Sequence, residues 1–133
     1  MTQTLDQKRA AFAWECADAG MKQHPKEYKT LAKGAPALIM NSGLMPTLAY
    51  YKGKGDAAEQ LLDDLIRGLS FRLGGKTLAP GQGNKMFEAF MRDDLQKSTS
   101  HDYLRYTDEA LELLKWIRQF VDAVPQGGRN AAA

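Results

Sequence analysis

Residues that could carry catalytic chemistry are few in this sequence and lie far apart. The only histidines are His24 and His101, and neither has a second ligand at the helical spacing that a zinc site uses. The His101-Asp102 pair is a weak metal signal, because a phosphohydrolase built on such a pair needs further histidine and aspartate ligands. The sequence therefore predicts no metal site, and we keep an enzyme using His101-Asp102 only as a third alternative.

Two acidic doublets, Asp63-Asp64 and Asp93-Asp94, fall within predicted helices. Successive side chains on a helix point in different directions, so neither doublet aims two carboxylates at one ion. We interpret both doublets as helix-surface charge.

The remaining candidates for covalent or phosphate chemistry are also weak. Cys16 falls on an apolar helical stripe with no base three or four positions away, which is typical of a small core residue. Gly81 and Gly83 lack the lysine and the hydroxyl residue of a phosphate-binding loop. We therefore predict a protein that is not an enzyme, with no catalytic residues and no cofactor.

Basic residues offer a different chemistry, the binding of phosphate groups. Residues 1–55 hold eight lysines and arginines against four acidic residues, a net charge of +4, whereas residues 56–133 hold ten against twelve, a net of −2. This asymmetry favours a polyanion at one face and a basic neighbour or second copy at another. Lys26, Lys29 and Lys33 recur on one side of a predicted helix, either as a phosphate-facing row or as an ordinary solvated face.

Helices must position these residues, because no segment alternates in the manner of a strand. Thr4 and Gln7 predict a capping box for a helix from Leu5 to about Gln23. A second helix runs from Lys26 through Pro36, with a bend, and ends at Gly43 in a left-handed C′ conformation. A short third helix follows from Leu44 to Tyr51, with Pro46 in its first turn.

The second half of the chain contains three further predicted helices. One opens at a cap formed by Asp56 with Glu59, carries a broad leucine face and ends at Gly74-Gly75. A loop of about ten residues, KTLAPGQGN, precedes the other two, Lys85–Lys97 and His101–Val124. Residues 98–100 offer several N-cap hydroxyl groups for the last helix.

These patterns predict an all-α fold, a single compact bundle of about six helices with a kinked helix-glycine-helix segment at its centre. Residues 1–124 form one domain and residues 125–133 a flexible tail. With 133 residues, 44% hydrophobic and 26% charged, the chain has the composition of an ordinary globular protein. A single cysteine and the lack of a secretory segment favour the cytoplasm, and no apolar run reaches the ~18 residues of a membrane span.

Trp14 lies off the apolar stripe of the first helix, on a second face with Ala10, Ala17 and Met21. A second apolar face indicates either a helix wrapped on two sides within the monomer or a contact with a partner. We predict Trp14 at a subunit interface, and keep its burial in the monomer core as the alternative.

Three blocks of the sequence match a known family: TLDQKRAAFAWE at 4–15, YKTLAKGAPALIMNSGLMPTLAYYKGKG at 28–55 and YLRYTDEALELLKWIRQF at 103–120. Through these blocks the sequence resembles the helical small subunit of the type III-B CRISPR effector, the Cmr complex. The central block is the most specific. The resemblance implies a non-catalytic, cytoplasmic subunit for antiviral defence, of which several copies stack along the ribonucleoprotein and help to line the basic channel that holds guide RNA and target RNA.

The resemblance implies partners of three kinds: other subunits of the effector complex, copies of the same chain, and guide and target RNA, with no membrane. We expect the RNA contact to be electrostatic and independent of base sequence. The predicted RNA-contacting residues are Arg9, Lys29, Lys33, Lys52, Lys54 and Arg67. The alternative is a helical protein–protein adaptor or scaffold without direct RNA contact, in which the lysines serve only solubility.

Overall fold

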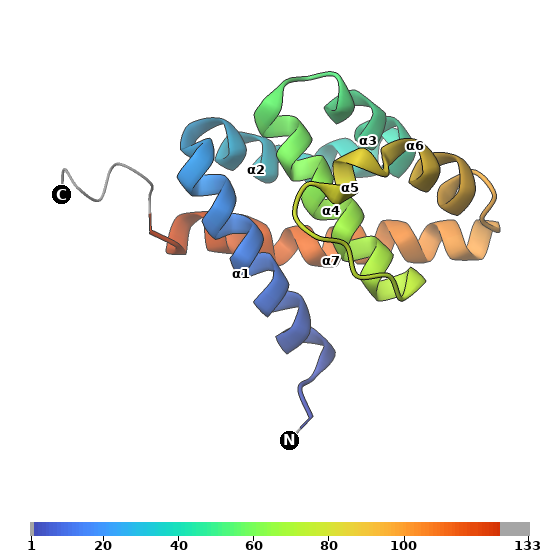
Figure 1. The fold of residues 1–133 in the computed structure, drawn as a ribbon, viewed down its shortest axis with the longest axis horizontal. Helices are drawn as coiled ribbons and strands as arrows, with labels where there is room; N and C mark the ends of the chain where they lie inside the picture. Colours follow the sequence, from blue (N-terminus) through green and yellow to red (C-terminus); the bar gives the residue numbers. More distant parts are fainter. Residues whose placement is uncertain (1, 126–133) are drawn as a thin grey trace.

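Helices make up nearly all of the computed structural model, which describes residues 2–125. The long helices among them are α1 (Leu5–Gln23), α2 (Pro25–Ser42), α3 (Leu44–Lys52), α4 (Asp56–Gly74) and α7 (Ser100–Ala123) (Figure 1). Short turns α5 (Gln82–Lys85), α6 (Phe87–Ala89) and the π-helical η1 (Phe90–Leu95) connect α4 to α7. The described residues include no strand, so the all-α prediction is confirmed. The tail expected at 125–133 lies, apart from Pro125, outside the described residues.

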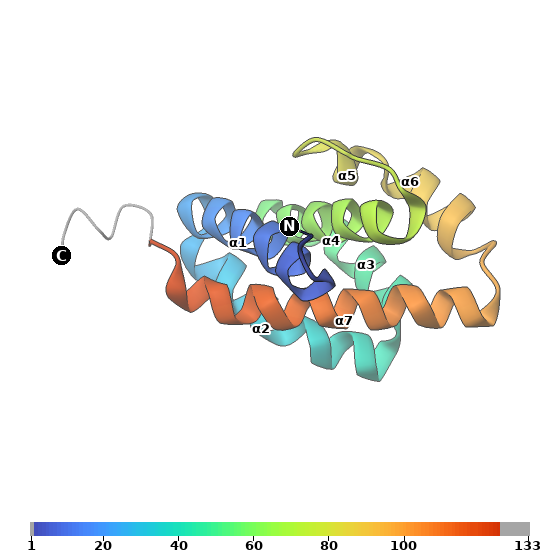
Figure 2. The ribbon, with the colours of Figure 1, turned by 90° about the horizontal axis from the view of Figure 1, so that it is seen from below.

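The helices stack in three tiers, which are clearest in Figure 2. Helix α7 lies beside α2 in one tier, α1 and α4 form the middle tier, α3 lies between these two tiers, and α5, α6 and the loop before them cover the far side of α4. Helix α4 contacts α1, α2, α3, α5 and α7. Both helices of the α2–Gly43–α3 segment contact α4, and Ala35, Ile39, Leu44 and Leu48 of this segment are buried. No described helix is long and apolar enough to cross a bilayer.

Two of the three predicted N-terminal caps are confirmed. The Thr4 hydroxyl accepts from the Gln7 backbone N–H at 3.1 Å, while the Gln7 amide oxygen accepts from the Thr4 N–H at 2.7 Å, which is a complete capping box. The Thr99 hydroxyl caps α7. The predicted cap of α4 is wrong, because Gly55 is the N-cap residue and Glu59 accepts instead from the side chain of Asn84.

The prediction of one helix at Lys85–Lys97 is also wrong. The backbone leaves the α conformation at Met86, and the chain then widens into the π-helical η1, where the Gln96 N–H donates to the Met91 carbonyl five residues back. A π-turn changes which side chains share a face. Phe90 and Leu95, five residues apart, are both buried in this arrangement.

Helix α4 is buried on more than its leucine face. Leu61, Leu62, Leu65, Ile66 and Leu69 are fully buried, as predicted, but two of its acidic residues are buried as well, with Asp63 only 6% and Asp64 only 2% exposed. The interpretation of this doublet as helix-surface charge is therefore wrong, whereas Asp93 of the other doublet is 61% exposed at its side chain. A buried carboxylate needs charged or hydrogen-bonding partners.

Arg67 supplies the charged partner for both buried carboxylates. Its Nε lies 3.0 Å from Asp63 Oδ2 and its Nη2 lies 2.9 Å from Asp64 Oδ1. The Tyr28 hydroxyl of α2 donates to the other oxygen of Asp64 at 2.6 Å. We call these four residues the buried ion cluster. It ties α2 to α4 through the interior.

Asp63 also holds the loop that follows α4. Its Oδ2 accepts from the Gly81 N–H at 3.0 Å and its Oδ1 from the Asn84 N–H at 2.8 Å. The loop comes so close that a Cβ atom on Gly83 would lie 2.5 Å from the Asp63 carbonyl oxygen. Only glycine fits there without a shift of the backbone.

Burial is the largest influence on the pKa values of the titratable side chains in this region. It raises the pKa of Asp64 to about 7, against the hydrogen bond from Tyr28 and the charge of Arg67, which act to lower it. Burial likewise raises the pKa values of the Tyr28 hydroxyl and the Cys16 thiol well above their ordinary values. Cys16 is a buried, free thiol, in agreement with its prediction as a core residue.

Gly43 joins α2 to α3 with φ 96° and ψ 163°. The positive φ was predicted, but the extended ψ differs from the left-handed helical conformation and belongs to a region that glycine alone adopts readily. Its N–H still donates to the Ile39 carbonyl at 2.8 Å.

Gly43→Val should therefore cost about 1–3 kcal/mol of folding free energy, because a branched side chain is strained at this φ and ψ. In a domain of this size 1 kcal/mol corresponds to about 3–5 °C, so we expect the melting temperature to fall by about 3–15 °C. The matched control is Gly53→Val, since Gly53 has φ −108° and open space around it. Equal melting temperatures for the two variants would contradict the assignment.

Asp64→Asn should change how stability depends on pH. Because the pKa of Asp64 is raised to about 7 in the folded state, the native protein keeps a proton that the unfolded chain releases near pH 4. The contribution of Asp64 to stability is therefore full at low pH and falls as the pH rises towards 7. We expect the free energy of unfolding of the wild type, relative to Asp64→Asn, to decrease between pH 4.5 and 7 in urea titrations. A constant or rising difference would contradict the raised pKa.

Candidate functional site

The six predicted RNA-contacting residues occupy separate places in the fold. Arg9 and Arg67 line one groove between α1 and α4. Lys29 and Lys33 meet at the end of α7, through one shared acidic partner. Lys52 and Lys54 lie at the turn between α3 and α4. The structure thus brings them together in pairs and does not form a single basic patch of all six.

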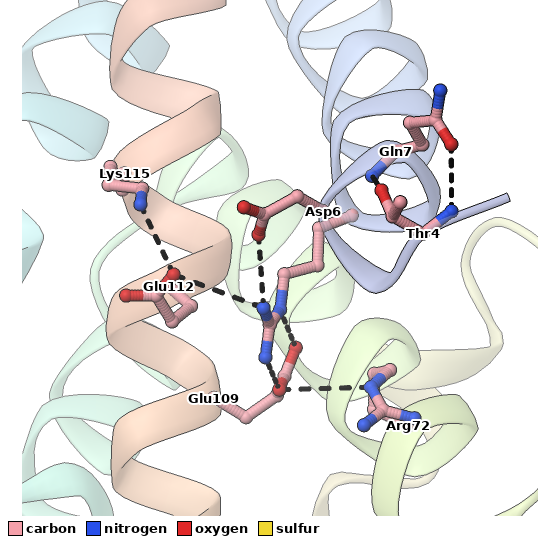
Figure 3. Close-up of polar contacts among 8 residues, drawn as sticks. Thr4, Asp6, Gln7, Arg72, Glu109, Glu112 and Lys115 are labelled. Carbon is pink, nitrogen blue, oxygen red and sulfur yellow. Dashed lines mark hydrogen bonds and ion pairs between the residues drawn. The ribbon is translucent and has the colours of Figure 1, made fainter.

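Arg9 is held by acidic residues of the same chain. Its Nε and Nη2 make a two-point contact with the Glu109 carboxylate of α7, at 2.9 and 2.7 Å, and Asp6 lies 3.2 Å away (Figure 3). The side chains of Arg9 and Glu109 are only 14% and 6% exposed. The hydrogen bond to Glu109 raises the pKa of Arg9. A phosphate group would reach this guanidinium only by displacing Glu109.

Arg67 is engaged in the same way within the buried ion cluster. Its side chain is 13% exposed. Burial acts to lower the pKa of Arg67, and the neighbouring Asp64 and Asp63 outweigh it, so the pKa is raised overall. Like Arg9, this arginine is committed to internal carboxylates.

Lys29 and Lys33 share the Asp122 carboxylate of α7. Their ammonium groups lie 2.8 and 2.5 Å from its two oxygens, and these hydrogen bonds lower the pKa of Asp122 to about 2. All three side chains are between 39% and 47% exposed. Exposed pairs of this kind are weak and are screened by salt, so a phosphate can compete with Asp122 for both lysines.

Lys52 and Lys54 have no acidic partner within the described part of the chain. The Lys52 ammonium donates to the side-chain and backbone oxygens of Asn84, at 2.8 and 3.3 Å. The Lys54 ammonium lies 5.0 Å from the ring centroid of Tyr50, which is 52% exposed. A cation next to an exposed aromatic ring offers a contact for a phosphate and a surface for a base.

Trp14 lies in an aromatic cluster at the surface between α1 and α7. Its ring meets Phe120 edge to face at 5.1 Å between centroids, and Phe120 packs in turn on Trp116 at 5.8 Å. Trp14 is 42% exposed, so the alternative of burial in the monomer core does not describe it. The buried face of α1 instead contains Ala13, Cys16, Ala17, Gly20 and Met21.

Within the described residues, no group of three histidine, cysteine, aspartate or glutamate side chains lies in a position to hold a metal ion. His101 is exposed at the start of α7. The Asp102 carboxylate is paired with Arg105 at 3.5 Å.

Sequence reasoning missed the acidic partners of the two arginines. Arg67 follows Asp63 by four residues and Asp64 by three, the spacing at which opposite charges meet on a helix. That signal was present in the sequence. The pairing of Arg9 with Glu109 joins residues 100 positions apart, and no local pattern could have indicated it.

The comparisons with known proteins agree with this fold. The family of CRISPR-associated proteins named Cas_Cmr5 matches residues 5–124 of the chain. The crystal structure of a CRISPR-associated Cmr5 family protein from Thermus thermophilus superimposes with a TM-score of 0.69 at 26% sequence identity, covering 92% of this chain and 98% of that chain. The chain therefore belongs to the Cmr5 family of CRISPR-associated proteins and is a small, all-helical subunit of the type III-B Cmr complex.

Proposed function

We propose that this subunit is non-catalytic, that several copies stack along the effector, and that they help to line the channel that holds guide and target RNA. Membership in the Cmr5 family supports a place in the effector complex. The main observation in favour of the RNA contact is the Lys54 ammonium beside the exposed Tyr50 ring, near the turn between α3 and α4. It is a cation that no carboxylate of the described chain neutralises.

A second contact is proposed at Lys29 and Lys33. Their shared partner Asp122 lies at the surface, 47% exposed, and a phosphate diester can take its place when two ammonium groups face it. Arg9 and Arg67 contribute in this proposal through their charge at a distance, because their hydrogen bonds are committed to Glu109, Asp63 and Asp64.

Stacking of copies is proposed from surfaces of unlike character. A groove of about 750 Å³ lies between α1, α4 and α5, and its lining holds Glu15, Asp56 and Glu59 beside Lys85 and the paired Asp63, Asp64 and Arg67. Lys29 and Lys33, in contrast, lie together on α2. Unlike surfaces on identical chains favour a head-to-tail contact that repeats along an axis over a closed two-fold dimer. The Trp14 cluster supplies an exposed aromatic anchor for such a contact.

The alternative function, a helical adaptor without RNA contact, is favoured by one observation. Both arginines among the six candidates face internal carboxylates, which leaves lysines alone to meet phosphate. The two functions differ in whether RNA affinity depends on those lysines and on salt.

Lys54→Ala should lower the affinity of the assembled complex for single-stranded target RNA. Because each bound phosphate adds about 0.7 to the slope of log affinity against log salt concentration, the slope should become shallower by about that amount for every phosphate that the variant no longer binds. Filter binding between 50 and 300 mM salt measures both effects. Lys97→Ala is the matched control, because the Lys97 side chain is 76% exposed and its replacement removes the same charge at another place on the surface. An unchanged slope for Lys54→Ala, or an equal change for the control, would support the adaptor.

Trp14→Ala should abolish self-association in sedimentation velocity while leaving helicity intact. The ring is 42% exposed and packs edge to face on Phe120. We therefore expect a loss of about 1–3 kcal/mol in folding free energy, from the aromatic pair and the covered part of the ring. Met40→Ala, at a residue 76% exposed on α2, is the control for removing exposed apolar surface. A loss of about 3–5 kcal/mol, as for a fully buried tryptophan, would rule out the interface assignment.

A further inference from the structure

An apolar groove of about 590 Å³ lies between α1, α4 and the loop at 77–82. Its apolar lining comes from Phe12 of α1, Phe71 of α4, Leu113 of α7, and Leu78 and Pro80 of the loop. The volume is within the range of sites that bind a small ligand or a few side chains of a partner. Neither the proposed RNA contact nor the Trp14 cluster uses this groove.

One wall of the groove is a large apolar side chain turned to solvent. Phe71 is 54% exposed, although its neighbours on α4 at 69 and 70 are buried. The Arg67 guanidinium also lines the groove and lies 5.1 Å from the Phe12 ring centroid. An exposed phenylalanine at the edge of an apolar concavity is the arrangement of a docking site for an apolar side chain.

The rim of the groove carries two cations, Lys8 and Arg72, that have weak partners or none among the described residues. The Arg72 Nε is buried and makes no hydrogen bond, and its nearest anion is the Glu109 carboxylate at 3.8 Å, which Arg9 already occupies (Figure 3). Lys8 makes no ion pair among the described residues. The other two cations of the lining, Arg9 and Arg67, are already paired with internal carboxylates. Lys8 and Arg72 therefore favour an occupant that brings a carboxylate.

We propose that the groove binds an acidic, amphipathic peptide segment of another subunit, with its apolar side chains on Phe12 and Phe71 and a carboxylate at Arg72 and Lys8. A groove between helices suits a peptide with spaced apolar anchors, whereas nucleotide bases stack on open aromatic platforms along a basic track. The proposal rests on membership in the Cmr complex but is independent of the RNA contact.

The test is photo-crosslinking in the reconstituted complex, with p-benzoylphenylalanine in place of Phe71. The matched control carries the same group in place of Leu104, which is 56% exposed on α7. Crosslinked products are digested with nuclease and with protease and identified by mass spectrometry. Arg72→Glu, Arg72→Lys and Lys8→Glu are each combined with the crosslinker at position 71, and thermal melts of each isolated variant report its folding.

We expect position 71 to crosslink to a protein segment in which apolar residues alternate with aspartate or glutamate, at about ten times the yield of position 104. Arg72→Glu should reduce this yield severalfold and Arg72→Lys should retain it, while Lys54→Ala should leave it unchanged. If Arg72→Glu fails to fold, Lys8→Glu gives the same test on an exposed residue. Crosslinks to RNA or to a basic segment, yields equal to the control, or indifference to charge reversal would each overturn the proposal.

Discussion

The fold depends on one buried electrostatic constraint, the two carboxylates that α4 carries into the interior. Two adjacent aspartates without partners would be very costly to bury, and Arg67 with Tyr28 provides those partners. Because Tyr28 belongs to α2, the cluster fixes α2 against α4. Because Asp63 also accepts from Gly81 and Asn84, it fixes the loop that covers α4. Helix packing and loop position are thus consequences of the same pair of charges.

Among the six candidate RNA-contacting residues, the arginines and the lysines have different partners. A guanidinium binds a carboxylate at two points in a fixed plane, whereas an ammonium is a mobile and strongly hydrated point charge. Arg9 and Arg67 accordingly pair with carboxylates inside the fold, and the candidate lysines stay at the surface on weak or neutral partners. A surface that binds phosphate groups through such lysines recognises the charge and spacing of the RNA backbone, so it can bind an RNA of any sequence.

How much could be read from the sequence depends on the range of the interaction. The capping box at Thr4, the positive φ of Gly43 and the leucine face of α4 arise within a few residues, and the sequence predicted each of them. The break at Met86 could not be predicted in this way, because the α5 turn is held by Asp63, about twenty residues earlier. The same applies to Glu59, whose carboxylate accepts a hydrogen bond from the Asn84 side chain and does not cap the start of α4. Among the candidate site residues, the positions of the lysines followed from helix periodicity, but the commitment of Arg9 depended on a helix 100 residues away.

The two proposed binding surfaces share one anchor. Asn84 receives the Lys52 ammonium on its oxygens, and its backbone N–H donates to Asp63. Asp63 in turn holds Gly81, next to Pro80 in the wall of the apolar groove. The segment at 77–81 is not helical, and the two hydrogen bonds from Gly81 and Asn84 fasten it and the start of α5 to α4. A single acidic side chain of α4 therefore supports, through Asn84, Lys52, which the sequence predicts to contact RNA, and, through Gly81, the wall of the groove proposed to receive a partner subunit.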